Sequence, residues 1–264
     1  MSVLRIFSYL PNPRIAKATI AARLCGVSLE VRGAPVQELQ DWLWDFDAHP
    51  LSVEERDALR HCVRTGRTGF TSALYKTDAF LAAHPFGAVP AAFDPSGQTG
   101  IFESNSILRA VARLGDGRVP IYGSDAYSAS RIDGFLDASL LFARDTQLYV
   151  LALRAETVSA GLHAAAQQAF TSYLSGIERA LASGAGFIAG GTLSLADICF
   201  AAELALFHNE RVHHGQLHRA GLAPVLSDGV AAEHPLAWAH FGRLCAHEAF
   251  APDIEPYLEA FGKH

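Results

Sequence analysis

The sequence predicts an α/β domain with a mixed sheet, followed by an all-helical domain. In residues 1–115, short β-rich runs alternate with helical patterns. From residue 126 to residue 264, apolar residues recur only with helical spacing. A Gly- and Pro-containing stretch, residues 115–125, separates the two parts as a linker. The chain of 264 residues, half of them hydrophobic, is long enough to bury a full core in each part.

The first elements form a βαβ unit. Val3–Ser8 alternates and is β-rich, which indicates a strand. Asn12 is a favourable N-cap and Pro13 a favourable first helical residue, and the helix they open stops at Gly26. Val27–Arg32 then predicts a second strand. Because the connections are short, we expect the two strands to be parallel with a right-handed crossover.

Residues 36–72 interrupt this pattern as an insertion. We expect two helical pieces. One of them starts at Ser52, with Glu55 completing a capping box, and ends near Gly66. The other carries apolar residues at helical spacing: Leu39, Trp42, Leu43 and Phe46. Two interpretations are open for the insertion. It is either a decorated loop that packs on its own domain or on a partner subunit, or a lid over an apolar substrate pocket.

The rest of the first domain predicts a short helix, two strands and a longer helix. The short helix covers Thr77–His84, and the strands are Val89–Phe93 and Gly100–Phe102. Glu103 and Ser104 open the longer helix, which places a carboxylate and a hydroxyl beside free backbone donors. Such residues are ordinary helix caps, but they also suit a small zwitterionic ligand. The order β-α-β, insertion, α-β-β-α is that of a thioredoxin-like domain.

The second domain predicts helices throughout. Ser194 and Asp197 form a capping box at the start of one helix, which continues through apolar residues. The other expected helices cover Ala126–Glu156, Ser159–Ser183, Pro235–Ala249 and Asp253–Phe261.

Composition excludes several function classes. The net charge of −6 and the lack of basic runs argue against nucleic acid, and no apolar run reaches membrane-spanning length. The four cysteines are scattered without metal-ligand spacing, so we expect no metal site and a cytoplasmic, reduced protein. We expect the polar, His-rich stretch 208–218 to be a surface loop.

Several motifs, taken in order, resemble the glutathione transferase superfamily. Val89-Pro90 precedes the third strand, Glu103-Ser104 starts the next helix, and Ser194-x-x-Asp197 caps a later one. Within that superfamily the sequence is similar to the transferase-like domain of translation elongation factor one-B gamma. The pattern that carries this similarity consists of Ser8-Tyr9, Asn12, Arg14, Lys17-Ala18, Ile20-Ala21-Ala22, Ala34-Pro35, Val89-Pro90, Phe102-Glu103-Ser104-Asn105, Ile107 and Leu195-Ala196-Asp197.

The resemblance implies a site for glutathione as co-substrate. It implies that Pro90 follows a cis bond and that the backbone of Val89 pairs with the cysteinyl residue of glutathione. It also implies that Glu103 and Ser104 hold the γ-glutamyl end. Lys76 and Arg14 are alternative partners for the glycyl carboxylate.

The resemblance places the glutathione sulfur at the start of the first helix. Asn12 can donate an amide N–H to a thiolate there but cannot take its proton. Asn12 is therefore the first candidate for stabilising the thiolate, Ser8 is the second, and Arg14 adds positive potential. Asn12 acting only as an N-cap is an equal alternative. Because Cys25 lies at the far end of the helix, disulfide exchange is disfavoured.

The resemblance thus implies a glutathione-dependent transferase or lyase. Its thiolate would attack an apolar, aromatic electrophile, and β-aryl ether cleavage, as in related bacterial enzymes, is one such reaction. The alternative is a non-catalytic scaffold module, as in the elongation factor. The resemblance also implies a homodimer, or a heterodimer with a related subunit.

Overall fold

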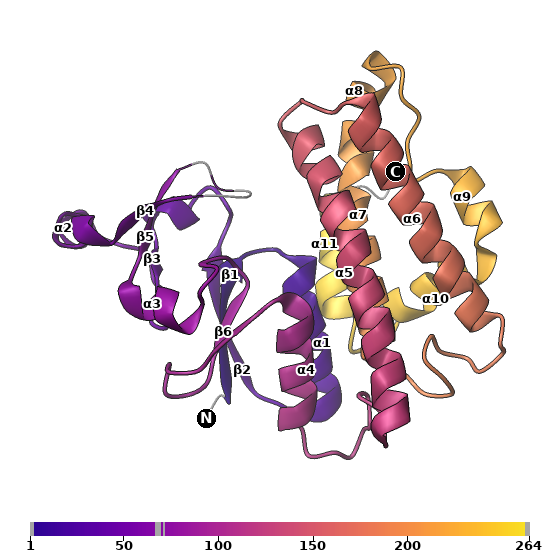
Figure 1. The fold of residues 1–264 in the computed structure, drawn as a ribbon, viewed down its shortest axis with the longest axis horizontal. Coiled ribbons are helices and arrows are strands. Elements are labelled where there is room, and N and C mark those ends of the chain that lie inside the picture. The colour runs from indigo at the N-terminus through magenta and orange to yellow at the C-terminus, as the bar shows by residue number, and fades with distance from the viewer. Residues whose placement is uncertain (1–2, 67–69, 71, 262–264) are drawn as a thin grey trace. The chain divides into compact units, whose positions relative to one another are not determined.

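The computed structural model describes residues 3–66, 70 and 72–261 of the chain (Figure 1). These residues divide into two compact units, Met1–Asp116 and Gly117–His264. The first unit combines strands and helices, and the second is helical throughout its described residues. The predicted fold class, an α/β part followed by an all-α part, is therefore confirmed.

The first unit is built on a four-stranded mixed sheet. The strand order is β2-β1-β6-β7, in which β1 and β2 are parallel and the other neighbours are antiparallel. The parallel pair confirms the predicted βαβ unit, although both strands lie a residue or two later than expected. The strands are β1 (Leu4–Tyr9), β2 (Leu29–Ala34), β6 (Ala91–Phe93) and β7 (Gly100–Phe102).

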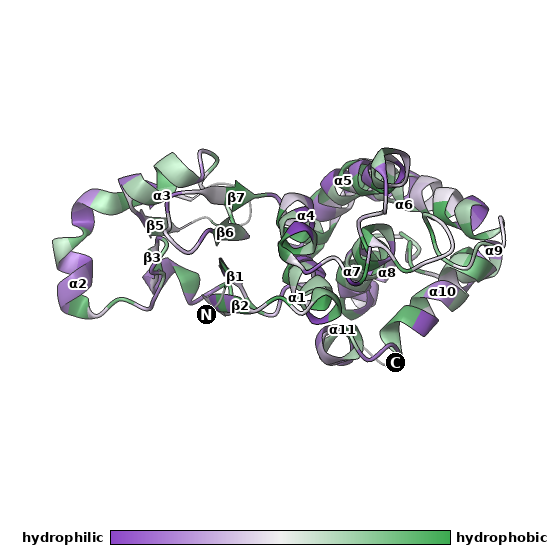
Figure 2. Ribbon diagram, turned by 90° about the horizontal axis from the view of Figure 1, so that it is seen from below, coloured by the Kyte–Doolittle hydropathy of each residue, from purple (hydrophilic) through white to green (hydrophobic). Residues whose placement is uncertain are grey.

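Two helices cover one face of this sheet. They are α1 (Pro13–Cys25) and α4 (Ser104–Leu114), which lie side by side (Figures 1 and 2). The α1 helix begins after Asn12, whose side chain accepts a hydrogen bond from a first-turn N–H. It ends at Gly26, which has a φ of 67°. Because glycine has no Cβ, it adopts this left-handed conformation without strain.

The insertion forms a second sheet, which the sequence analysis missed. The expected first helix is wrong: a single 3₁₀ turn, η1 (Leu39–Asp41), leads into a strand. The second helix does begin after Ser52 with its capping box, but it ends at Ala58 rather than near Gly66. The sheet has the order β3-β5-β4, with β3 (Leu43–Trp44), β4 (Val63–Thr65) and β5 (Ala73–Lys76), and α2 (Val53–Ala58) and η2 (Arg60–Cys62) precede β4.

Tertiary packing overrides the helical spacing of the insertion. The indole of Trp44 is 1% exposed and makes edge-on contacts with the rings of Phe7 and Phe80. Its Nε1–H donates to the carbonyl of Leu39 at 3.0 Å. An aromatic ring fits a pleated, half-buried surface well, so this contact favours a strand at Trp44. The insertion is therefore part of the core of its own unit.

The unit continues with α3 (Asp78–Ala83), which is capped by Thr77. The second sheet and α3 lie on the side of the mixed sheet opposite α1 and α4 (Figures 1 and 2). Side chains alternate accordingly: Phe7 and Phe93 face the insertion core, and Ile6 is buried on the other side. The mixed sheet is thus covered on both faces.

The second unit packs its helices around α7 (Leu195–Phe207). Every residue of α7 except Leu206 is buried, and the helix lies among the others in Figure 2. The predicted Ser194–Asp197 capping box opens it. The surrounding helices are α5 (Ala126–Arg154), α6 (Ala160–Leu181), η3 (His208–His213), α8 (His214–Arg219), α9 (Asp228–Glu233), α10 (Pro235–Cys245) and α11 (Ala251–Ala260).

The expected surface loop at residues 208–218 is wrong. This stretch is helical, and His208, Asn209 and Glu210 are buried. Glu210 accepts hydrogen bonds from the backbone N–H groups of Val225 and Leu226, which satisfies its buried carboxylate. Within the described residues, no cluster of three metal-ligating side chains occurs, and no helix has the length and apolarity to cross a membrane.

Candidate functional site

Strands β1 and β7 end where β6 begins, on the same side of the mixed sheet, and we call this row of strand ends the sheet edge. Ala91 of β6 pairs with Phe7 of β1 on one side and with Phe102 of β7 on the other. One step further along the same register brings Pro90 level with Ser8 and Glu103. Neighbouring strands lie about 4.8 Å apart, so these three positions form a contiguous edge. Tyr9, at the end of β1, pairs with Ala34 and extends this edge to β2.

The chain approaches this edge at Val89-Pro90. The bond between these residues is cis, as the resemblance implies, and both residues are half-buried. A second cis bond, Leu10-Pro11, lies between β1 and α1.

Ser8 and Asn12 lie next to each other at the start of α1. The Nδ2 atom of Asn12 donates to Ser8 Oγ at 3.2 Å. Its Oδ1 atom accepts from the backbone N–H of Arg14 at 3.0 Å, which is the N-cap bond. Ser8 is 0% exposed, and Asn12 is 6% exposed. Asn12 is therefore closer to the surface than Ser8. Its side-chain amide has two N–H groups, and only one of them donates to Ser8.

Glu103 and Ser104 stand where β7 passes into α4. Glu103 has a φ of 67°, and its carbonyl accepts from the N–H groups of Ser106 and Ile107. A positive φ is strained for a residue with a side chain, and such strain is found preferentially at functional sites. The Glu103 carboxylate makes no capping bond and is exposed, whereas Ser104 is buried. The carboxylate is thus turned to solvent beside the N-terminus of α4.

Lys17, to which the sequence analysis assigned no role, contacts the predicted site residue Ser104. Its side chain is 0% exposed, and its Nζ atom donates to Asn105 Oδ1 at 2.8 Å and to Ser104 Oγ at 3.3 Å. The ammonium takes a lone pair of the Ser104 hydroxyl, so the hydroxyl proton can be donated to a ligand. The sequence did carry a signal for this buried contact: Lys17 is the single charged residue in the otherwise uncharged stretch Ile15–Ile20.

His84 is a second residue that sequence reasoning missed. It is buried, and its Nδ1 atom accepts from the N–H of Gly87 at 3.1 Å. Its ring stacks against Phe80 and packs against Phe102. Burial lowers the pKa of His84, and the nearby positive charge of Lys76 lowers it further. A neutral His84 therefore fixes the turn that leads to Val89.

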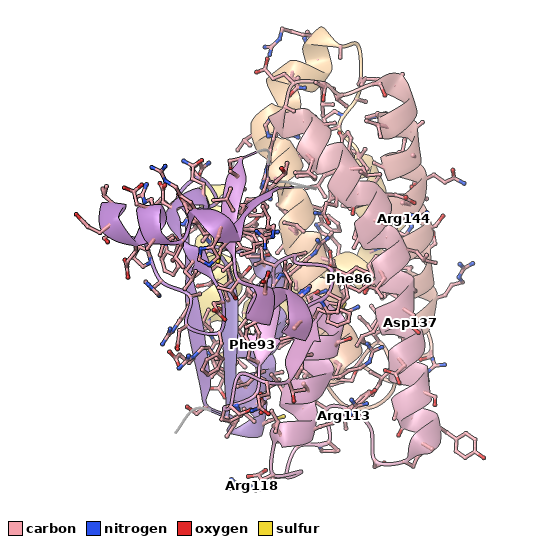
Figure 3. The ribbon with its side chains drawn as sticks, turned by 60° about the vertical axis from the view of Figure 1, so that its left-hand side comes forward. Phe86, Phe93, Arg113, Arg118, Asp137 and Arg144 are labelled. Atoms are coloured by element: carbon pink, nitrogen blue, oxygen red, sulfur yellow. The ribbon has the colours of Figure 1, made fainter. Side chains whose placement is uncertain are left out.

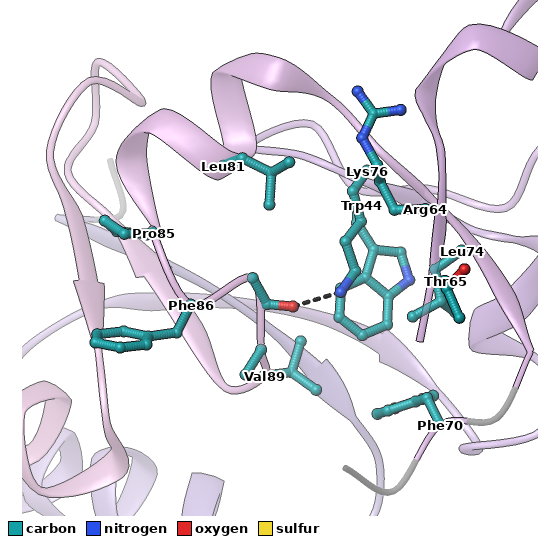
Figure 4. Close-up of a pocket in the computed structure, with 12 residues that line it drawn as sticks. Trp44, Arg64, Thr65, Phe70, Leu74, Lys76, Leu81, Pro85, Phe86 and Val89 are labelled. Atoms are coloured by element: carbon teal, nitrogen blue, oxygen red, sulfur yellow. Dashed lines mark hydrogen bonds between the residues drawn. The ribbon is translucent and has the colours of Figure 1, made fainter. Parts of the chain in front are cut away.

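A pocket of about 620 Å³ lies on the insertion side of Val89 (Figure 4). Trp44, Phe70 and Phe86 supply aromatic wall. The ammonium of Lys76 donates to the carbonyl of Gly87 at 2.5 Å and lies 4.6 Å from the centre of the Trp44 ring. The pocket therefore combines aromatic surface with positive charge, and its described lining residues all belong to the first unit.

The predicted site residues thus lie together: six of them lie at or beside one sheet edge, and Arg14 lies in the first turn of α1 next to them. Ser8, Asn12, Val89, Pro90, Glu103 and Ser104 line or adjoin the same sheet edge. Arg14 contributes its backbone N–H to the Asn12 cap. The edge offers backbone groups for an extended peptide, a carboxylate for an ammonium, and a hydroxyl at a helix N-terminus for a carboxylate.

No protein-family model matches the sequence, and no curated protein matches it. Solved structures do. A glutathione S-transferase-like protein from Lodderomyces elongisporus matches with a TM-score of 0.66 and 19% identity, over 96% of this chain and 95% of that chain. A glutathione S-transferase from Methylobacterium radiotolerans, in complex with glutathione sulfonate, matches with a TM-score of 0.60 and 16% identity, over 95% and 94%.

A third example is glutathione S-transferase I from maize, in complex with an atrazine glutathione conjugate. It matches with a TM-score of 0.63 and 15% identity, over 98% of this chain and 99% of that chain. The likeness extends over nearly the whole of each chain. The protein therefore has the glutathione transferase fold.

Proposed function

We propose that this protein is a glutathione-dependent transferase that acts on an apolar, aromatic electrophile. One observation carries the proposal: Ser8, Pro90 and Glu103 lie level with one another at one sheet edge, beside the N-termini of α1 and α4. That arrangement supplies a peptide-pairing strand end and two anion-stabilising helix ends in one place.

The peptide part of glutathione would be held as follows. The backbone of Val89 pairs with the cysteinyl residue. The Glu103 carboxylate binds the α-ammonium of the γ-glutamyl end, and the Ser104 hydroxyl donates to its carboxylate, assisted by the buried charge of Lys17. For the glycyl carboxylate we favour Lys76 over Arg14, because Lys76 is bonded to Gly87, two residues before Val89.

The sulfur would lie at the start of α1. A thiolate is stabilised at a helix N-terminus, and Asn12 can donate to it through Nδ2. We assign this role to Asn12 rather than to Ser8, because Ser8 is fully buried and its hydroxyl already accepts a hydrogen bond from Asn12. Arg14 adds positive potential in the same turn. The thiolate then attacks the electrophile and displaces its leaving group. We propose β-aryl ether cleavage as the specific reaction of this kind.

We further propose a dimer, either of identical subunits or with a related partner. Leu141 and Leu148 are exposed on the part of α5 that also carries the exposed Asp137 and Arg144 (Figure 3). Exposed apolar side chains interleaved with charges suit a protein interface. The four cysteines are free thiols, which fits a reducing compartment such as the cytoplasm.

The test is retention on immobilised glutathione together with turnover of 1-chloro-2,4-dinitrobenzene and of a β-aryl ether. We expect retention and turnover of the aryl halide, with Asn12→Ala losing turnover but keeping retention. Loss of turnover in Ser8→Ala alone would reverse the two roles. A chain that is not retained at all contradicts the proposed site.

A non-catalytic scaffold is the second candidate. It is favoured by the two bonds of Asn12, since Oδ1 serves as the helix cap and Nδ2 contacts Ser8. Retention on glutathione without turnover of any electrophile would support the scaffold over the enzyme.

A further inference from the structure

A serine and a histidine of the helical unit form a hydrogen-bonded pair outside the proposed glutathione site. Ser175 lies near the end of α6, and His234 lies at the corner between α9 and α10, which passes alongside α6 (Figure 1). The Oγ atom of Ser175 and the Nε2 atom of His234 are 3.0 Å apart. The residues assigned to glutathione all belong to the other unit.

The second nitrogen of the His234 imidazole fixes the direction of this hydrogen bond. Its Nδ1 atom lies 3.0 Å from the backbone carbonyl of Val230, which can only accept. Nδ1 therefore carries the proton, and Nε2 presents its lone pair to the Ser175 hydroxyl, which donates to it. A nucleophile, a base within hydrogen-bond reach and a third group that orients the base are the recurring parts of an activated serine.

The histidine is held in place, whereas the serine can be reached from solvent. His234 is 5% exposed, and its backbone N–H also donates to the carbonyl of Val230, at 3.2 Å. Ser175 is only half-buried. A Cβ placed on the next residue, Gly176, would meet no atom of another element within 4 Å. An electrophile can therefore approach the Ser175 hydroxyl beside Gly176.

We propose that Ser175 accepts an acyl group from an activated ester, with His234 as its general base. Ser175 Oγ forms a bond to the carbonyl carbon of the ester, and the hydroxyl proton passes to His234 Nε2. The bond between the carbonyl carbon and the leaving oxygen then breaks, and the leaving alcohol takes the proton from His234. The products are an acyl ester of Ser175 and the free alcohol, so no other reactant is required.

The adjacent helix end favours a single acylation over continued hydrolysis. The N–H groups of Leu236 and Ala237, at the start of α10, donate to the Glu178 carboxylate at 3.1 and 2.8 Å. They are therefore engaged and do not stabilise the oxyanion of a tetrahedral intermediate, where one such donor contributes a factor of about 10²–10³ in rate. Water should then attack the less reactive ester of Ser175 slowly, so that the acylated protein accumulates.

The experiment treats the full-length protein with p-nitrophenyl acetate in the absence of glutathione. It follows the release of p-nitrophenol and maps the acetyl group by mass spectrometry. We expect a burst of about one equivalent, with the acetyl group on Ser175. Ser175→Ala should lose the burst, whereas Ser172→Ala, which changes an exposed serine one turn earlier on α6, should keep it.

Two further variants test the role of the histidine. His234→Gln should slow the acetylation of Ser175 about a hundredfold, the low end of the contribution of a general base. Ser175→Cys should restore the burst that Ser175→Ala loses, because a thiol can use the same base. If His234→Gln does not fold, the comparison of Ser175→Ala with Ser172→Ala still decides the site.

Two results would overturn the proposal. In the first, Ser175→Ala and Ser172→Ala are acetylated to the same extent. In the second, a His234→Gln variant that melts at the wild-type temperature is acetylated at Ser175 at an unchanged rate. Because glutathione is omitted and the variants lie in the second unit, a chain that is not retained on glutathione contradicts the proposed function and leaves this test unaffected.

Discussion

Glu103 combines a strained backbone, with a positive φ, and a carboxylate that we assign to the ligand. Two substitutions separate these features. Glu103→Ala removes the carboxylate and keeps a Cβ at a φ of 67°. Glu103→Gly removes both. Relief of the strained conformation contributes about 1–3 kcal/mol. The greater freedom of glycine in the unfolded chain offsets about 0.4–1 kcal/mol of that gain. We therefore expect Glu103→Gly to be more stable than Glu103→Ala by about 1 kcal/mol.

The same pair of variants reports on ligand binding. Because the Glu103 carboxylate is exposed, its bond to the glutathione ammonium should contribute about 1.5 kcal/mol, the low end for a charged hydrogen bond. Both variants should then bind glutathione about tenfold more weakly. Glu156→Gly is the control: Glu156 also has a positive φ, 55°, but lies after α5. That variant should gain stability and keep its glutathione affinity.

Urea and thermal unfolding measure the stability, and calorimetric titration with glutathione measures the affinity. A stability difference of 1 kcal/mol should appear as a shift of about 3 °C in the melting temperature. If Glu103→Gly is no more stable than Glu103→Ala, the backbone at this position is not strained. If Glu103→Ala keeps the full affinity for glutathione, the carboxylate does not hold the ammonium.

Three further predictions concern buried polar groups. Lys17→Met leaves Ser104 Oγ and Asn105 Oδ1 without the ammonium donor, so urea unfolding should show a loss of about 2 kcal/mol, whereas an unchanged midpoint would contradict the buried contact. Asn12→Asp keeps the cap acceptor but places a negative charge near the glutathione thiolate, which should raise the pKa of the thiol. The pH–rate profile should therefore move up by about one pH unit. An unchanged profile would show that Asn12 does not lie at the sulfur. Burial lowers the pKa of His208 to about 4. The unfolded chain then takes up this proton at higher pH than the folded one, so stability present above pH 6.5 is lost as the pH falls towards 4. Between pH 7 and pH 5, His208 should account for a loss of about 2 kcal/mol in urea unfolding, and the His208→Gln variant should lack that part of the loss.

Local signals were sufficient for much of the fold. Asn12 before α1, Pro13 at its first position, Gly26 after it, and the Ser52 and Ser194 capping boxes all appear where the sequence predicted them. Each of these signals acts within a turn of the backbone, by satisfying donors or acceptors that the helix leaves open. Such signals do not require knowledge of distant residues.

The insertion shows where local signals fail. Its apolar spacing predicted a helix, but the Trp44 side chain gains more from the rings of Phe7 and Phe80 than from helical neighbours. The residues Val63–Thr65 likewise pair with Ala73–Tyr75 across the insertion. The Trp44 contacts join residues 36 or more positions apart in the chain, so they could not be read from a window of the sequence, whereas the β4–β5 pairing joins residues 8–12 positions apart.

By itself, the sequence determined the fold class, the helix boundaries set by caps, and the list of candidate residues at strand and helix ends. Only the tertiary structure decided which of these residues meet. The register of β6 between β1 and β7 brings Ser8, Pro90 and Glu103 level, although about 95 positions separate the first from the last. It also decided that Lys17 is buried against Ser104 and that the insertion lines a cationic aromatic pocket. The physical reason is that burial and strand pairing depend on the whole packed chain, whereas caps depend on a few adjacent residues.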